Sequence, residues 1–339
     1  MIDEIILEDI ERIRSNLKKG DFEGKRVLAT GGAGFIGSWL VDVLVGFDAE
    51  VDCVDNLSTG KMENIDHLLG KLKFRFINED VCTFKGGIKY DYILHLASRA
   101  SPEEYQQHPI ETLQANSVGS YNMLELARKH DSTILFASTS EVYGDAEVFP
   151  TPESCWGHVN PVGSRSCYYE GKRFAEALFM AYHTKYGFDM RVARIFNSYG
   201  PRLRAEGAYG RAVSRFITQA LVNQPITVYG DGTQTRSFCY ITDTIVGLLL
   251  LLTSQRTKGE VVNIGNPKEI TISELAWKIK QLTRSASPIT FHSLPEDDPT
   301  RRCPDIGKVE RLLGWKPKIG LEQGLKRTIE WFRKISNVN

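Results

Sequence analysis

KRVLATGGAGFIGSWLVDVL, residues 25–44, decides the fold. The stretch runs from a short strand-like segment through a glycine-rich turn into an amphipathic helical pattern. Gly31, Gly34 and Gly37 fit the spacing G-x-x-G-x-x-G, and Gly32 with the last two also fits G-x-G-x-x-G. Glycine permits the tight turn and lets the backbone approach a pyrophosphate, which the N–H groups of the helix start can bind. The stretch therefore predicts a dinucleotide-binding turn.

An acidic residue follows at a position that supports this interpretation. Asp55 ends the second strand-like run, and a carboxylate at that point can bind both hydroxyls of a ribose. No arginine follows it directly in DNLSTGK, and an acid there would repel a 2′-phosphate. The pattern favours NAD as the cofactor, with NADP as an alternative because of Lys61. A turn needed only for helix packing is the structural alternative.

Strand-like runs alternate with helical patterns up to about residue 196, which is typical of βαβ units. The runs are RVLAT (26–30), EVDCVD (50–55), KFRFIN (73–78), YDYILHLA (90–97), STILFAST (132–139) and MRVARIF (190–196). They predict an α/β fold with a Rossmann-type, doubly wound parallel sheet and a smaller C-terminal substrate-binding domain.

We expect three parts in the chain. Residues 1–24 carry an apolar stripe and predict an N-terminal amphipathic helix. Residues 25–196 form the predicted dinucleotide-binding domain, to which a segment near 236–264 returns. Residues 197–235 and 265–339 form the predicted substrate-binding domain, because glycine-rich and polar stretches there are typical of ligand-binding loops.

Composition excludes several classes of function. Lysine plus arginine and aspartate plus glutamate both number 42, so bulk charge supports neither nucleic-acid nor membrane binding. The 6 cysteines contain no C-x-x-C pair, so no disulfide framework or zinc site is expected, and a cytoplasmic location is favoured. The longest apolar run, 245–252, is too short to cross a bilayer. Metalloprotease, P-loop and serine-hydrolase motifs were not found, and no metal site is predicted.

Hydroxyl, phenol and amine groups occur at positions that can act together. Thr139, Ser140 and Glu141 lie near the carboxyl end of the STILFAST run, at the sheet edge where α/β proteins bind ligands. At 100° per residue, Tyr168 and Lys172 share one face of a predicted helix. A nearby ammonium can lower the pKa of a phenol, so Tyr168 is the predicted base. Taken alone, the hydroxyls could form a turn and the lysine could extend past the tyrosine to solvent.

Together with the glycine-rich turn, these residues resemble the extended short-chain dehydrogenase/reductase family. The second half adds RIFNSYGPR, ITVYGDGTQTRSFCYITD, VVNIGN and DDPTRRCPDIGKVERLLGWKP, which are similar to nucleotide-sugar enzymes. HLASRASPEEY, STSEVYGD and WGHVNPVGSRSCYYEGKR resemble the UDP-glucuronate decarboxylases. The chain departs from their pattern at Arg99 and Ser164, where proline is usual, and at Tyr169, where aspartate is usual.

The resemblance implies a reaction and a set of site residues. Tyr168, Lys172 and Thr139 would oxidise the sugar at C4 with NAD, CO2 would leave the 4-keto-uronate, and reduction would give UDP-xylose with NAD regenerated. Ser140 and Glu141 are candidates for steering the carboxylate or for donating the C5 proton. Arg236 completes the predicted catalytic set, because similarity places it at the diphosphate or the sugar carboxylate.

Binding residues are also implied. The predicted NAD site comprises Gly31, Gly34, Phe35, Ile36, Gly37, Asp55, Asn56, Ser58, Thr59, Gly60, Asp80, Val81, Leu96, Ala97, Ser98, Asn116, Tyr168 and Lys172. The predicted UDP-sugar site comprises Arg99, Glu141, Asn197, Arg211, Val213, Tyr229, Arg236 and Arg302, in which Arg211 and Arg302 are diphosphate candidates and Tyr229 could stack on uracil.

Two other classes of function remain open. A nucleotide-sugar 4-epimerase or 4,6-dehydratase would share the turn, Tyr168 and Lys172, although dehydratases resemble T-D-E where this chain has Ser140. A non-catalytic NAD-binding protein would commonly lack the tyrosine or the lysine.

The resemblance also implies a homodimer formed by helices near 101–128 and 168–186. We further predict that Tyr169 faces away from the site, so that phenylalanine there is mild.

Overall fold

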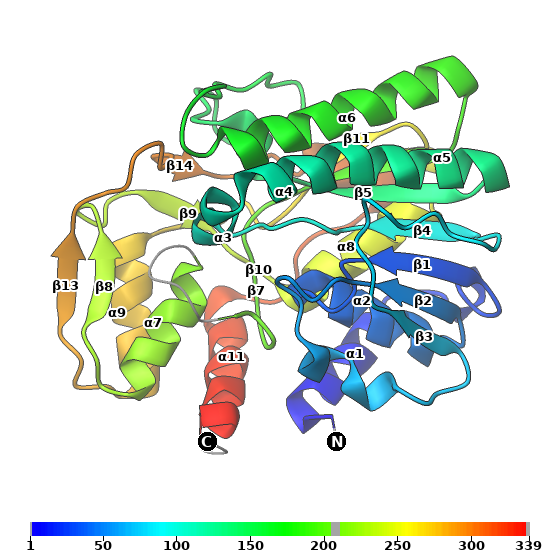
Figure 1. Cartoon of the computed structure of the whole chain (residues 1–339). Coiled ribbons are helices and arrows are strands. Elements are labelled where there is room, and N and C mark those ends of the chain that lie inside the picture. The colour runs from blue at the N-terminus through cyan, green and yellow to red at the C-terminus, as the bar shows by residue number, and fades with distance from the viewer. Residues whose placement is uncertain (1, 205–210, 337–339) are drawn as a thin grey trace.

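The computed structural model describes residues 2–204 and 211–336 (Figure 1). Within them lies a parallel sheet of seven strands in the order β11-β6-β5-β4-β1-β2-β3. The strands are β1 (Arg26–Thr30), β2 (Glu50–Val54), β3 (Phe74–Ile77), β4 (Tyr92–His95), β5 (Thr133–Thr139), β6 (Met190–Ile195) and β11 (Val261–Ile264). The sequence-based prediction of a doubly wound parallel sheet is confirmed, and β1 to β6 coincide with the six predicted runs.

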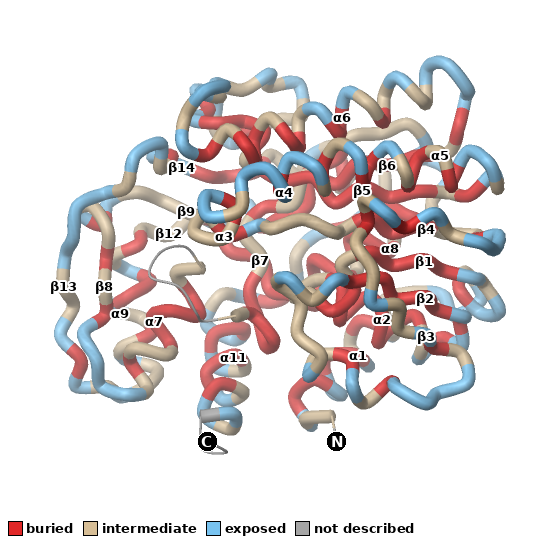
Figure 2. The backbone as a smooth tube through the Cα atoms, in the orientation of Figure 1, coloured by how far each residue is buried: buried red, intermediate tan, exposed pale blue. Residues whose placement is uncertain are grey.

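Helices cover both faces of this sheet (Figure 1). On one face lie α4 (Pro109–Gln114), a π-helical turn (Ala115–Gly119), α5 (Ser120–His130) and α6 (Ser166–Tyr186), preceded by α3 (Pro102–Gln107). On the other face lie α2 (Phe35–Gly46), α8 (Ile241–Thr253) and α1 (Glu4–Arg14). The central strands are accordingly buried on both sides, as Figure 2 shows.

The glycine-rich turn joins β1 to α2 through backbone contacts that leave no room for a side chain. Gly31 has φ of 70°, and a Cβ placed on it would lie 2.8 Å from the backbone nitrogen of Ala97. A Cβ on Gly37 would lie 2.2 Å from the carbonyl oxygen of Gly31. These positions require glycine, and the N-terminus of α2 consequently points at the carboxyl edge of the sheet, between β1 and β4.

Helix α1 packs on the body of the protein and is shorter than the predicted 24 residues. Its buried face presents Ile6, Ile10 and Ile13 to the main core. Asp9 is fully buried in the same face, accepts a hydrogen bond from Tyr240 and pairs with Arg327 at 3.0 Å. Burial raises the pKa of this carboxyl group, and the two partners oppose that shift. The helix therefore connects the sheet region to the C-terminal helix.

The C-terminal part is built from short ladders and helices beside the sheet. It contains β8 (Ile226–Tyr229) with β13 (Ile289–His292), β12 (Glu269–Thr271) with β9 (Thr235–Ser237) and β14 (Arg301–Arg302), and β7 (Ser198–Tyr199) with β10 (Cys239–Tyr240). Its helices are α7 (Ala212–Leu221), α9 (Ile272–Thr283), α10 (Gly307–Leu313) and α11 (Leu321–Ser336).

The predicted division into domains stays a prediction, although β11 and α8 do return to the sheet from the C-terminal half. Among the described residues, no helix combines the length and apolar character that a bilayer span requires.

Candidate active site

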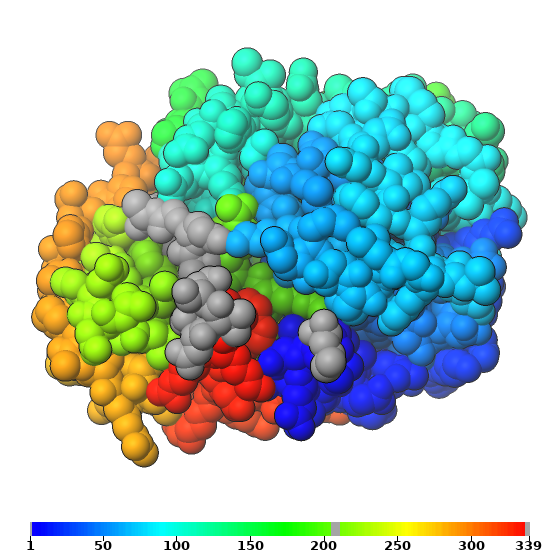
Figure 3. Space-filling view, turned by 60° about the horizontal axis from the view of Figure 1, so that its bottom comes forward, coloured from blue at the N-terminus to red at the C-terminus, as the bar shows by residue number. Residues whose placement is uncertain are grey.

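A cavity of about 490 Å³ lies where the sheet region meets the C-terminal part. Figure 3 shows the two regions side by side, the first in blue and cyan and the second in lime to orange. The floor is formed by the carboxyl ends of the central strands, which is the usual ligand position in open α/β sheets. The opposite wall comes from the segments around α7, β8, β9 and the loop at residues 298–299.

One end of the cavity contains the glycine-rich turn and Asp55. The Asp55 side chain is 8% exposed and accepts hydrogen bonds from the backbone N–H groups of Ala33 and Leu57, at 3.0 and 2.8 Å. Burial raises the pKa of this carboxyl group, and the two N–H groups oppose the shift. Asn56 donates to Asp80 at 2.7 Å on the neighbouring strand end. The carboxylates of two adjacent strands thus line the same end of the cavity.

Most of the predicted cofactor residues line the cavity, and two lie behind its surface. Lining residues are Gly31, Gly34, Phe35, Ile36, Gly37, Asp55, Asn56, Ser58, Thr59, Asp80, Val81, Leu96, Ala97, Ser98, Tyr168 and Lys172. Gly60 lies under Asp55, where a Cβ would be 2.8 Å from the carboxylate oxygens. Asn116 donates to Ser98 at 3.0 Å and so supports a lining residue from the second layer.

Thr139, Tyr168 and Lys172 meet at the end of β5. The Thr139 hydroxyl group lies near the Tyr168 phenol, and both residues line the cavity. Lys172 lies one helical turn after Tyr168 and donates from Nζ to the carbonyl oxygen of Ala137 at 2.8 Å. Its Nζ lies 5.8 Å from the centre of the Tyr168 ring. The helical register predicted from the sequence is therefore the register that the structure has.

The pKa values of Tyr168 and Lys172 differ from our expectation. Burial raises the pKa of Tyr168 above its ordinary value, whereas we expected Lys172 to lower it. Burial also lowers the pKa of Lys172 to about 7, against the opposing effect of Glu176. Because the ammonium points to the Ala137 carbonyl group and holds its proton weakly, it gives Tyr168 little stabilisation in the protein alone.

Arg302 lies elsewhere than we expected for a diphosphate contact. Its side chain is 3% exposed and is not among the cavity-lining residues. The guanidinium donates to the carbonyl oxygen of Ser140 at 2.6 Å and to the Glu141 carboxylate at 2.7 Å. Strand β14, in which Arg302 lies, thereby fixes Ser140 and Glu141 from behind. Both of these residues do line the cavity.

Tyr169 is not among the cavity-lining residues, but it is buried directly beside residues that are, which we did not expect. The residue is 4% exposed and packs against the Tyr168 ring at 6.5 Å between ring centres. Its hydroxyl group accepts a hydrogen bond from Arg165 at 3.2 Å, and it also contacts Glu141. Arg165 and Glu141 both line the cavity. Helical phase separated Tyr169 from Tyr168 correctly, but the loop before α6 places site residues beside both.

Arginines and acids form the wall opposite β5. Asp298 accepts from Arg165 and from Arg236, each at 3.0 Å. Arg236 comes from β9 and also donates to the carbonyl oxygen of Pro299 at 2.7 Å. Arg215 lies over the Tyr229 ring at 5.0 Å. The remaining predicted substrate residues, Arg99, Asn197, Arg211 and Val213, also line the cavity.

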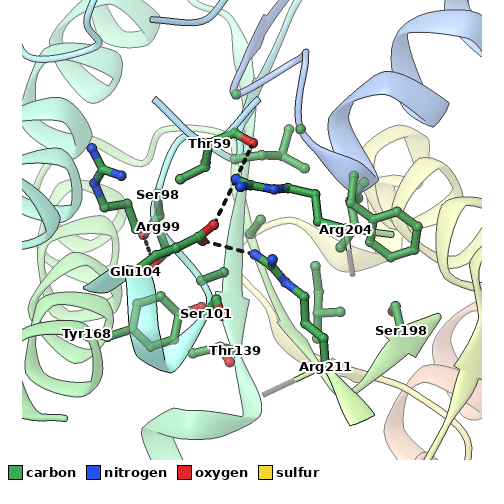
Figure 4. Close-up of a pocket in the computed structure, with 18 of the residues that line it drawn as sticks. Thr59, Ser98, Arg99, Ser101, Glu104, Thr139, Tyr168, Ser198, Arg204 and Arg211 are labelled. Carbon is green, nitrogen blue, oxygen red and sulfur yellow. Dashed lines mark hydrogen bonds and ion pairs between the residues drawn. The ribbon is translucent and has the colours of Figure 1, made fainter. Parts of the chain in front are cut away.

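Two arginines near α7 pair with an acid from the sheet region. Arg204 and Arg211 contact the two oxygens of the Glu104 carboxylate at 2.8 and 2.9 Å, as Figure 4 shows. Arg204 also donates to the carbonyl oxygen of Thr59 at 3.1 Å. Sequence reasoning missed Glu104, Arg204, Arg165 and Asp298. Arg165, Glu104 and Asp298 each lie within a stretch quoted above, but none was singled out there, and Arg204 lies two residues after RIFNSYGPR.

Comparison with known proteins gives concordant results. Residues 28–328 match the family model described as GDP-mannose 4,6 dehydratase. The chain is 51% identical over 310 residues to UDP-glucuronic acid decarboxylase 1 of Xenopus tropicalis, which covers 91% of this chain and 72% of that protein.

Solved structures of related enzymes share the fold. A UDP-glucose 4-epimerase of Thermotoga maritima with UDP-glucose has a TM-score of 0.83 and 31% identity, covering 92% of this chain and 99% of that one. A dTDP-glucose 4,6-dehydratase of Streptomyces venezuelae with NAD bound has a TM-score of 0.83 and 28% identity, covering 92% and 98%.

The buried Lys172 predicts a specific dependence of stability on pH. Its folded pKa of about 7 lies below that of an unfolded lysine. Between these values the unfolded chain binds a proton that the folded protein does not, so the wild type gains stability as the pH rises. From about pH 7 to about pH 9 this gain should be about 2 kcal/mol relative to Lys172→Met. Urea unfolding of both proteins, with Lys185→Met as the control on the same helix, measures it; parallel curves would contradict the burial of a titrating amine.

Proposed function

The chain belongs to the GDP-mannose 4,6-dehydratase family and, within it, to the UDP-glucuronic acid decarboxylases, and we propose that it converts UDP-glucuronate to UDP-xylose with bound NAD. The observation that carries this proposal is the position of Glu141. It lies in one cavity with Thr139, Tyr168, Lys172 and the dinucleotide-binding turn. Oxidation at C4 needs Thr139, Tyr168, Lys172 and the cofactor bound at the turn. Glu141 adds an acid that can act on the carboxylate at the neighbouring C5.

The residues at the turn fit NAD. The close backbone packing of Gly31 and Gly37 holds the first turn of α2 at the cavity, where its N–H groups can bind a pyrophosphate, and the buried Asp55 can accept hydrogen bonds from a ribose. An acid at this point disfavours the 2′-phosphate of NADP. When bound, NAD supplies the oxidation of the substrate at C4 and its later reduction. The chain's own residues handle the protons and the developing charge.

Tyr168 is the proposed base for the 4-hydroxyl group. Its phenol lies near Thr139, whose hydroxyl group can position the same substrate oxygen. Since burial raises the pKa of Tyr168, the phenolate has to gain stabilisation from a charged Lys172 as the site fills. The bond from Lys172 to Ala137 holds the ammonium one turn away, on the correct face of α6. The product of this step is a 4-keto-uronate.

Loss of CO2 follows from the position of the new ketone. The carboxylate is then β to the C4 carbonyl group, so the C5–C6 bond can break with its electron pair entering a C4–C5 enolate. Tyr168, now protonated, and Thr139 can donate hydrogen bonds to the enolate oxygen. A proton added at C5 and reduction at C4 complete UDP-xylose.

Glu141 and Ser140 are proposed to act at the substrate carboxylate and at C5. Arg302 holds both from behind, so their positions are fixed before the substrate arrives. A fixed carboxylate beside the substrate carboxylate favours departure of the charged group as neutral CO2. Tyr169, in contact with Glu141 and Arg165, supports this side of the cavity.

The opposite wall is proposed to bind the nucleotide. Arg236 and Arg211 offer guanidinium groups to the diphosphate, and the Tyr229 ring can stack on uracil. A UDP-sugar 4-epimerase is the second candidate, because a solved relative with that activity shares the fold at 31% identity. The same purified protein decides between the two by the product it makes.

A homodimer in a reducing compartment such as the cytoplasm is also proposed. Exposed apolar side chains follow the outer faces of α4, α5 and α6, which lie together in Figure 1: Ile110, Leu113, Tyr121, Phe174 and Tyr186. A second copy of these helices would bury them in a helix bundle. All 6 cysteines are free thiols, as expected for a reducing compartment.

Incubation with UDP-glucuronate tests the proposed reaction. NMR should show UDP-xylose and release of CO2, and Tyr168→Phe should lower the rate by at least about 10³-fold because the base is lost. Tyr169→Phe, which loses its contacts with Arg165 and Glu141, should lower it by about 3- to 30-fold. UDP-galacturonate as the product would show an epimerase, and a larger loss for Tyr169→Phe would reverse the assignment of the base.

Glu141→Gln separates oxidation from decarboxylation. The amide keeps the size of the side chain and removes its charge, so NADH absorbance should still form on mixing while CO2 release falls by about 10²-fold or more. Glu147→Gln is the matched control, since that side chain is 77% exposed on the next loop. Equal loss of both signals would assign Glu141 to substrate binding, and unchanged turnover would exclude any role.

The dimer is tested by sedimentation. Phe174→Glu together with Tyr121→Glu places charges on the proposed bundle surface and should give monomers at micromolar concentration. Trp277→Glu, at an equally exposed aromatic residue on α9, should sediment as the wild type does. A monomeric wild type would contradict the proposal.

A further inference from the structure

Glu104 forms an ion bridge between the two walls of the cavity (Figure 4). It comes from α3 on the sheet side, and its two arginine partners come from segments beside β7 and α7. The side chains are partly shielded, at 17% exposure for Glu104, 26% for Arg204 and 20% for Arg211. All three line the cavity. A ligand lying between the walls therefore meets this bridge.

Another acid in the cavity has a different position. Asp298 also joins two arginines, Arg236 in the same C-terminal part and Arg165 at the start of α6 on the sheet side. Glu104 differs because both of its arginine partners lie on the opposite wall, with the Arg204 bond to the Thr59 carbonyl group as a second crossing.

The chemistry of the bridge matches that of a nucleotide diphosphate. A carboxylate presents two oxygens to two guanidinium groups, and a diphosphate presents the same kind of acceptor with more charge. The two anions would repel each other if both stayed at this position. A carboxylate that stayed at this position would therefore weaken the binding of the substrate.

We propose that Glu104 holds the anion-binding position of Arg204 and Arg211 until the diphosphate of the nucleotide sugar displaces it. This inference rests on the proposed function for the identity of the sugar, but not for the chemistry of the anion. Glu104 thereby sets the affinity of the site, because each binding event must break its bonds to both arginines. Weak anions such as inorganic phosphate compete poorly with a carboxylate that is tethered in place.

Glu104→Gln tests the displacement directly. The neutral amide cannot compete for the arginines, so UDP titrated into the NAD-loaded protein by calorimetry should bind about 3- to 10-fold more tightly than to the wild type. The gain should shrink in high salt, since it arises from partly exposed charges. Glu322→Gln, which removes a carboxylate paired with Lys326 on the exposed side of α11, is the matched control and should leave UDP affinity unchanged. Circular dichroism checks that each variant is folded.

A second variant identifies the partner. Arg211→Gln should weaken UDP binding, and in that background Glu104→Gln should give a smaller gain than in the wild type. A full gain in the absence of Arg211, or equal or weaker UDP binding by Glu104→Gln alone, would overturn the proposal.

Titration of NAD into the cofactor-free protein separates the two possible diphosphates, because a change confined to NAD would assign the bridge to the cofactor. Failure to convert UDP-glucuronate would contradict the proposed function alone, because the UDP titrations still compare the variants.

Discussion

The contact between the backbones of Gly31 and Gly37 is the constraint on which the rest of the site depends. It brings the first turn of α2 against the end of β1, closer than any side chain would allow. The helix N-terminus then faces the crevice between β1 and β4, where the order of the strands reverses. Asp55 from β2 and the hydroxyl groups after β5 reach the same crevice from either side. One steric requirement thus sets the place of the cofactor and of the chemistry.

Electrostatics in the cavity follow a common arrangement. Four arginines that line the cavity are held by acids of the protein: Asp298 holds Arg165 and Arg236, and Glu104 holds Arg204 and Arg211. Behind the cavity surface, Arg302 is paired with Glu141. Such pairing keeps guanidinium groups in fixed positions inside a partly dry space. Binding of a substrate anion is then a competition with a protein carboxylate for the same arginines. The position of each carboxylate determines whether the anion displaces it. The pairing of Lys172 with a neutral carbonyl group follows a different principle, since it leaves the ammonium free to respond to the charge of Tyr168.

Much of the fold could be predicted from local patterns. The strand-like runs, the turn and the phase of Tyr168 against Lys172 each depend on neighbours within a few residues, so periodicity was sufficient. Arg302 could not be placed this way, because β14 reaches Ser140 from 162 positions away. Helical phase separated Tyr169 from Tyr168 but did not show that Tyr169 is buried against Arg165, because phase describes a helix surface and not the loop that covers it. Glu104 lies on a six-residue helix whose importance comes only from the arginines opposite.

The packing of α1 against α11 allows a circular permutation of the chain. Lys334 contacts Asp3 at 3.3 Å, and Figure 1 shows both ends of the chain on the side away from the α5–α6 layer. A short glycine-serine linker could therefore join the ends, and the polypeptide could be reopened at an exposed turn such as the one around Gly70. In such a circular permutant, the buried Asp9 and Arg327 would lie about 20 residues plus the linker apart in sequence, and the junction would add a covalent connection between α11 and α1.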